Sequence, residues 1–148
     1  MSRTYEDLKV WQKALELVYV IYDMTRAFPK DEMYGLVSQM GRAAVSIPSN
    51  IAEGKGRSTD KDFAVFLHHS RGSLHELETQ VRIAHHLGYI PAAAHPNLSE
   101  LVSEVGRLLK GADQLRHERL SRYAPTGAPR LQPGTWRLPP IPARSYEP

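Results

Sequence analysis

Carboxylates and imidazoles are the side chains of this sequence that could carry acid–base or metal chemistry. Helical bundles hold di-iron sites through glutamates and a Glu-x-x-His motif, which puts both ligands on one helix face. No glutamate of the chain is followed by a histidine three residues later. His-Glu-x-x-His, a phosphate-binding P-loop and a Gly-x-Ser-x-Gly nucleophile turn are also absent. We therefore expect no metal, no cofactor and no enzymatic activity.

Two segments of the chain each carry a row of polar side chains among apolar residues. Their members recur at intervals of three and four, which places them on one face of each predicted helix. Because an unpaired buried polar group costs about 1–3 kcal/mol, we expect one structural network: Ser46, Asn50, Glu53, Arg71, Ser73 and Glu76. The rival interpretation is an enzyme or cofactor carrier that uses Glu53, Glu76 and nearby histidines. Metal analysis and a visible spectrum would separate the two.

Cations gather around the Gly54-Lys55-Gly56-Arg57 loop and the last predicted helix. The net charge is +3, but Arg130, Arg137 and Arg144 against Glu147 account for +2 of it. Any role in binding nucleic acid must therefore rest on a local patch. The candidate residues are Arg42, Lys55, Arg57, Arg107, Lys110, Arg116 and Arg119. The alternative is an ordinary solvated charged face.

Apolar residues recur with the period of amphipathic α-helices. Proline, glycine and capping residues divide them into four helices, over about residues 5–27, 31–53, 59–88 and 97–120. Short connections make successive helices antiparallel, so we expect an all-α fold, an antiparallel up-and-down four-helix bundle. The bundle occupies residues 1–122, and a disordered proline-rich tail occupies residues 123–148, where seven of the 11 prolines fall.

The first predicted helix carries two apolar rows of the same spacing. One row forms a core seam: Leu8, Trp11, Leu15, Val18 and Tyr22. An apolar face this wide indicates deep burial or an oligomer contact. We assign the second row to contact with another copy of the chain: Val10, Ala14, Leu17, Ile21 and Met24.

Pro48 falls inside the second predicted helix. Proline has no N–H to bond to the Ala44 carbonyl, and its ring clashes with that carbonyl. We therefore expect a kink or a restart there. The capping-box spacing of Asn50 and Glu53 favours a restart at Asn50.

The composition points away from membranes and oxidising compartments. The chain has no cysteine and no apolar run near the roughly 20 residues that a membrane-spanning helix needs. Its first residues lack the layout of a secretory signal. We expect a cytoplasmic protein.

Three blocks of the sequence, Asp7 to Ala14, Ile47 to Arg57 and Gly72 to Glu78, resemble one family. Over about residues 5–120 they are similar to the bacterial four-helix-bundle proteins named after the intervening sequences of 23S ribosomal RNA genes. The resemblance implies a bundle that assembles as a ring-like homopentamer. It also implies kinship with the accessory variability protein of diversity-generating retroelements, which binds nucleic acid and a reverse transcriptase.

These observations together predict a non-enzymatic, homo-oligomeric bundle that acts as a scaffold or adaptor and contacts RNA or DNA through a local basic surface. Two alternatives remain open. One is a protein-interaction module with no role in binding nucleic acid, and the other is a bundle that binds a small ligand or cofactor.

Overall fold

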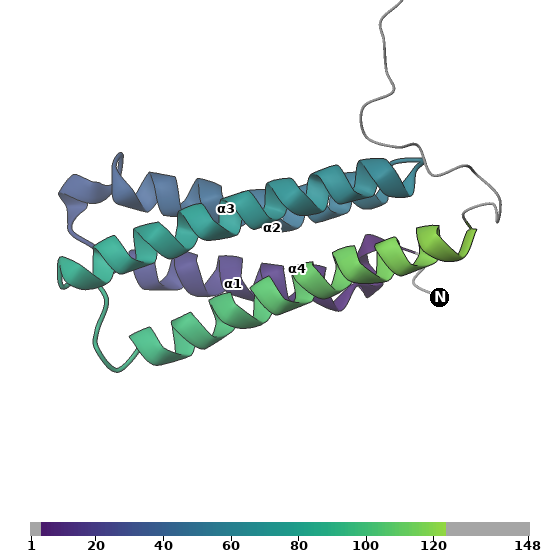
Figure 1. Ribbon diagram of the computed structural model, residues 1–148. Coiled ribbons are helices and arrows are strands. Elements are labelled where there is room, and N and C mark those ends of the chain that lie inside the picture. Colours follow the sequence, from purple (N-terminus) through teal and green to yellow (C-terminus); the bar gives the residue numbers. More distant parts are fainter. Residues whose placement is uncertain (1–3, 124–148) are drawn as a thin grey trace, which may run out of the picture.

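The computed structural model describes residues 4–123 of the chain. Within this range it contains four α-helices, two short 3-10 helices and no strand, which confirms the all-α prediction (Figure 1). The elements are η1 Tyr5–Asp7, α1 Lys9–Thr25, η2 Lys30–Glu32, α2 Leu36–Lys55, α3 Asp60–His86 and α4 His95–Tyr123. None of these helices is long and apolar enough to cross a membrane. The predicted tail, apart from Tyr123, lies outside the described residues.

The four helices pack around one core. α1 contacts α2 and α4, and α3 contacts the same two helices. In Figure 1 the colours run in opposite directions along successive helices, so the start of α1, the end of α2, the start of α3 and the end of α4 meet at one end. Every helix contributes fully buried side chains: Leu17, Ile21, Met40, Ile47, Ile51, Leu67, Leu77, Leu98, Val105 and Leu109.

α3 has the stripe and the boundaries that its sequence predicts. Leu67 and Leu77 lie in the core. The Thr59 hydroxyl caps the helix by accepting a hydrogen bond from the Asp62 backbone N–H at 3.1 Å. Gly88 follows the last turn with φ of 76°, the left-handed conformation that glycine tolerates. The sequence predicts Thr59 or Asp60 as the cap of this helix and Gly88 as its end, and the structure has Thr59 and Gly88 in these roles.

α1 buries the row that we assigned to an oligomer contact more completely than the row that we placed in the core. The row assigned to an oligomer contact lies inside the single chain, where four members are 5% exposed or less and Met24 is partly buried: Val10, Ala14, Leu17, Ile21 and Met24. In the other row, Val18 is also buried in the core, Trp11 and Leu15 are half-buried, and Tyr22 is 52% exposed. The two rows have the same spacing, so periodicity alone could not decide which of them faces α2 and α4.

α2 continues through Pro48, so the predicted restart at Asn50 is wrong. Side chains next to the proline bond to carbonyls of the preceding turn. The Ser49 hydroxyl donates to the Val45 carbonyl at 2.8 Å, and Asn50 Nδ2 donates to the Ser46 carbonyl at 2.8 Å. These bonds reach the Val45 and Ser46 carbonyls, whereas the carbonyl that Pro48 leaves without a helical donor is that of Ala44. Ile47 and Ile51, fully buried on either side of the proline, hold this part of α2 against the core.

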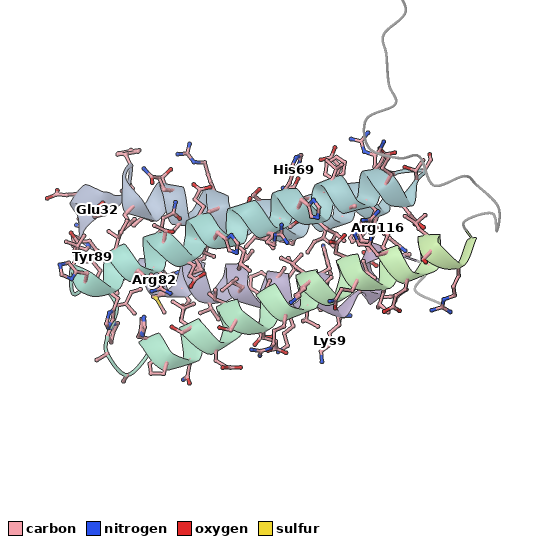
Figure 2. All side chains as sticks on the ribbon, viewed as in Figure 1. Lys9, Glu32, His69, Arg82, Tyr89 and Arg116 are labelled. Atoms are coloured by element: carbon pink, nitrogen blue, oxygen red, sulfur yellow. The ribbon has the colours of Figure 1, made fainter. Side chains whose placement is uncertain are left out.

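Glu32 organises the end of the bundle opposite to the chain's N-terminus (Figure 2). Its Oε2 accepts from the Leu36 backbone N–H at 3.0 Å, and its Oε1 accepts from the Tyr89 hydroxyl at 3.3 Å. α2 therefore begins at Leu36 rather than near Asp31. Burial, together with the charge of Glu32, raises the pKa of Tyr89.

The sequence spacing predicts one seam along α4, and the helix follows it for only part of its length: Leu98, Leu101, Val105, Leu108, Ala112 and Leu115. Leu101 and Val105 are buried as expected, but Leu109 then enters the core at 2% exposure. Leu115, the last member of the predicted seam, is 69% exposed. A straight helix rotates by about 20° per heptad relative to a seven-residue repeat, which carries the last members of such a row away from the core.

Candidate functional site

A cleft of about 720 Å³ lies where the four helix ends meet, and we call it the basic cleft. Its cations come from the end of α2, the following loop and the last turns of α4: Lys55, Arg57, Arg116, Arg119 and Arg122. Its apolar lining comes from α1, α3 and α4 and the residue before α1: Leu8, Val10, Phe63, Ala112 and Leu115. Residues more than 50 positions apart in the sequence thus share one concave surface.

The short connection between α2 and α3 brings Lys55 and Arg57 to the cleft. At Gly54 a Cβ atom would lie 2.5 Å from the Phe66 Cβ and 3.0 Å from Phe63 Cδ2. Only glycine allows the two helices to approach this closely. The chain then reverses within four residues between Lys55 and Asp60, so the loop cations are held close to the start of α3.

The arginines of the cleft are already paired with carboxylates. Arg57 Nη2 lies 2.5 Å from Glu53 Oε1, and Arg122 Nη2 lies 3.9 Å from Glu118 Oε2. Arg119 pairs with Asp60 across the cleft, joining α4 to α3. The paired carboxylates partly neutralise these arginines. The positive potential of the cleft is therefore lower than its cations alone would produce.

Lys55 differs from these arginines. Among the described residues, no carboxylate lies within 4 Å of its ammonium group, which sits 6.0 Å from the Phe63 ring centroid. The Arg57 guanidinium lies 4.9 Å from the Phe66 centroid. Cations over aromatic faces are attracted by the ring quadrupole. This arrangement keeps Lys55 available for an anion while fixing its position.

Asp113 holds α4 against α3 beside the cleft. Its Oδ2 lies 3.3 Å from His68 Nε2, and its Oδ1 accepts from Arg116 at 3.3 Å. Figure 2 shows Arg116 between the two helices, where its side chain is only 9% exposed. Burial alone would raise the pKa of Asp113, but the hydrogen bond and charge of His68, together with Arg116, outweigh it and lower that pKa.

The structure separates the seven cations that we predicted as one surface. Lys55, Arg57, Arg116 and Arg119 line the basic cleft. The other three are exposed elsewhere: Arg42, Arg107 and Lys110. Arg122 was missed as a member of the cleft, although its spacing of three residues from Arg119, on the same face of α4, was a usable signal.

Three of the six residues predicted as a polar network are joined between α2 and α3. The hydroxyls of Ser46 and Ser73 lie 2.9 Å apart, and Asn50 Nδ2 donates to the Ser46 hydroxyl at 2.9 Å. The other three are exposed and do not join this cluster: Glu53, Arg71 and Glu76. Long charged side chains reach solvent from the edge of a helix pair, whereas serine and asparagine are short enough to stay inside.

Two further polar residues of α3 are buried: Ser70, for which the heptad spacing predicts a core position, and Gln80, which was missed. The Ser70 hydroxyl is fully buried and donates to the Ile47 carbonyl at 2.9 Å. Gln80 is 5% exposed, and its Oε1 has no hydrogen-bond partner, while its Nε2 donates to Glu76 at 3.2 Å. Ser70 sits in the apolar row of α3, so its core position could be predicted from the spacing.

A second concave surface, the apolar groove, lies between α1 and α2. Its lining is almost entirely apolar: Tyr5, Trp11, Leu15, Val18, Val45, Pro48, Ser49 and Ala52. The Tyr5 and Trp11 rings meet edge to face at 5.2 Å. Tyr19, on the next turn of α1 after Leu15, is 66% exposed. Three members of the row that we predicted as core thus line this groove: Trp11, Leu15 and Val18.

The carboxylates of the rival enzymatic interpretation do not converge. Glu53 pairs with Arg57, and Glu76 accepts a hydrogen bond from Gln80 on its own helix. Within residues 4–123, no group of three or more histidine, cysteine, aspartate or glutamate side chains is arranged to hold a metal ion.

Four helices around one core, with a polar seam between α2 and α3, define an all-α four-helix-bundle protein. A family model described as 23S rRNA-intervening sequence protein matches residues 6–111. The chain therefore belongs to the 23S rRNA-intervening sequence protein family.

Among solved structures, the chain is similar to a protein with unknown function from the S23 ribosomal protein family of Bacteroides thetaiotaomicron. The two are 21% identical, the match covers 71% of this chain and 95% of that chain, and the TM-score is 0.66. At this identity the likeness shows the fold alone. A comparison with curated proteins finds no match.

Proposed function

We propose that this chain is a non-enzymatic scaffold subunit that associates with copies of itself through the apolar groove. The observation that carries the proposal is the aromatic and aliphatic lining of that groove, with Trp11 and Val45 on its two walls and Tyr19 and Tyr22 exposed beside it. Tyrosine and tryptophan are enriched in protein interfaces, and a continuous exposed apolar surface is typical of a contact site.

A second copy of the chain is the partner that we propose for this surface. The groove runs along two helices, so a different face of another subunit could cover it lengthwise, and a contact between two different faces is what a ring of identical subunits requires. The resemblance to the intervening-sequence proteins implies a ring of five such subunits. The groove replaces the row from Val10 to Met24 as the proposed contact, because that row lies largely in the core.

Light scattering at micromolar concentration tests the oligomer. We expect the purified chain to have several times the mass of one subunit, and the Val45→Arg variant to have a lower mass. Val65→Arg is the matched control, since Val65 is a similarly exposed helical valine on α3, outside the groove. A monomeric parent chain, or equal masses for both variants, would contradict the proposal.

We further propose that the basic cleft contacts the phosphate backbone of RNA or DNA. The supporting observation is that Lys55, Arg57 and Arg119 converge there from separate segments. The resemblance also implies a reverse transcriptase as a protein partner, which co-purification of the two would test.

Salt dependence is the direct test of phosphate contacts. Three cations on a single strand predict that log Kobs falls with log salt at a slope of roughly −2, since each contact adds about −0.7. Fluorescence anisotropy with a labelled strand measures this slope. Absence of binding at low salt would remove this second proposal and leave the oligomer proposal intact.

A further inference from the structure

The basic cleft combines two chemistries that a surface for duplex backbones does not require. Its lining joins the cations Lys55, Arg57 and Arg119 to the apolar side chains of Phe63, Leu115 and Ala112. A contact with the duplex backbone needs the cations alone, because the faces of the bases stay stacked inside a duplex. The apolar lining therefore points to a ligand with both an anionic part and an apolar part.

Leu115 is the clearest sign of such a ligand. This leucine is 69% exposed, although the neighbouring turns of α4 place Leu109 in the core. Phe63 is half-buried opposite to it, with Lys55 near its ring. A flat base could lie against these side chains, because aromatic and apolar surfaces accept any base without reading its sequence.

Two arginines of the cleft can exchange their carboxylate partners for a phosphate. Arg57 and Arg119 are paired with Glu53 and Asp60, but both arginine side chains are at least half exposed. Solvent-exposed ion pairs contribute little to stability, so a phosphate can take their place at small cost. The guanidinium fork suits two phosphate oxygens at once, and Lys55 adds a point charge.

The size of the cleft fits one nucleotide. Its volume of about 720 Å³ lies within the range of roughly 300–1,000 Å³ typical of small-molecule sites. We infer that the basic cleft binds an unpaired nucleotide of a single strand, with its base against Phe63 and Leu115 and its phosphate among Lys55, Arg57 and Arg119. This inference rests on the proposed contact with nucleic acid, and it names the class of nucleic acid.

Three probes of equal length test the inference: a labelled oligothymidylate of about 12 nucleotides, an abasic strand with the same phosphates, and a duplex. We expect the oligothymidylate to bind about tenfold more tightly than the abasic strand, since stacking of one base supplies an effect of this size. The duplex should bind no better than the abasic strand. Equal affinity for all three would overturn the inference and leave the phosphate contact standing, whereas no binding to any of them would remove both.

A pair of surface variants locates the base. Leu115→Ser should weaken binding of the oligothymidylate several-fold and leave the affinity for the abasic strand unchanged. Ile83→Ser is the matched control, because Ile83 is an exposed apolar residue of α3 that does not line the cleft. Equal binding of the oligothymidylate by both variants would contradict the assignment. Displacement of the strand by thymidine monophosphate at comparable concentration would overturn the strand as ligand and identify a free nucleotide instead.

Discussion

The seam between α2 and α3 and the end of α4 are held by different forces. α2 and α3 meet through the close approach at Gly54 and through buried hydroxyls such as that of Ser70. The last turns of α4 reach α3 through the ion pair of Arg119 with Asp60 and the hydrogen bond between His68 and Asp113. The first contact is buried and uncharged, whereas the second is charged and partly exposed to solvent.

This difference indicates which part of the molecule can accept a ligand. Close packing and buried hydrogen bonds tolerate few rearrangements, because any change leaves a void or an unpaired polar group. Exposed ion pairs are weak and are screened by salt. The basic cleft lies between these two regions, with one rigid wall and one wall whose contacts can be exchanged for those of an anion.

Gly54→Ala should have the largest effect, because it attacks the rigid seam directly. The added methyl group would lie 2.5 Å from the Phe66 Cβ, so the helices must separate or Phe66 must move. We expect a loss of about 1–3 kcal/mol in the free energy of unfolding, measured with urea. Gly72→Ala is the control: a Cβ there meets nothing within 4 Å, so alanine should stabilise the helix by about 0.5–1 kcal/mol. Equal stability of the two variants would show that the seam is not tightly packed.

Ser70→Ala should have the next largest effect. It removes a buried hydroxyl that donates to the Ile47 carbonyl across the seam, so we expect a loss of about 1 kcal/mol in the free energy of unfolding. Ser103→Ala, at an exposed position of α4, should change stability by less than about 0.5 kcal/mol. If both variants unfold at the same urea concentration, the hydrogen bond between the helices adds nothing measurable.

Asp113→Asn tests the charged contact between α4 and α3 and should have the smallest effect. We expect a loss of at most about 1 kcal/mol in the free energy of unfolding, because the site is partly solvated. The pKa of Asp113 in the folded chain lies below its ordinary value of 3.8. The ionised group therefore stabilises the fold above that value, and this contribution is lost as the pH falls through the folded pKa. The difference in unfolding free energy between parent and variant should shrink as the pH falls below about 3.8 and the Asp113 carboxylate of the folded chain becomes protonated. A difference that stays the same down to the lowest pH at which the chain folds would contradict this prediction.

The helices could be predicted from the sequence because their signals are local. Thr59 and Gly88 mark the ends of α3 through the hydrogen bonding and dihedral preferences of single residues. Of the two outcomes predicted for Pro48, a kink or a restart, the restart at Asn50 was wrong, because burial of Ile47 and Ile51 in the core outweighs the local capping signal.

The surfaces could not be predicted in the same way. On α1 the rows containing Leu17 and Leu15 are equivalent in spacing, and only packing against α2 and α4 separates core from groove. The basic cleft joins Lys55 to Arg119, and no local rule relates two residues so far apart. Their meeting follows from the lengths of all four helices together.

The most direct test asks whether nucleic acid binds specifically at the basic cleft or equally well at other cationic parts of the surface. Two double variants remove the same charge, Lys55→Gln with Arg57→Gln in the cleft, and Arg42→Gln with Arg107→Gln outside it. Anisotropy with a labelled oligothymidylate at low salt compares them. We expect the cleft variant to lose about tenfold or more in affinity, and the magnitude of its salt slope to decrease by about 1.4. The other variant should bind like the parent chain. Equal losses in the two variants would show that binding is diffuse and would contradict the cleft as the site.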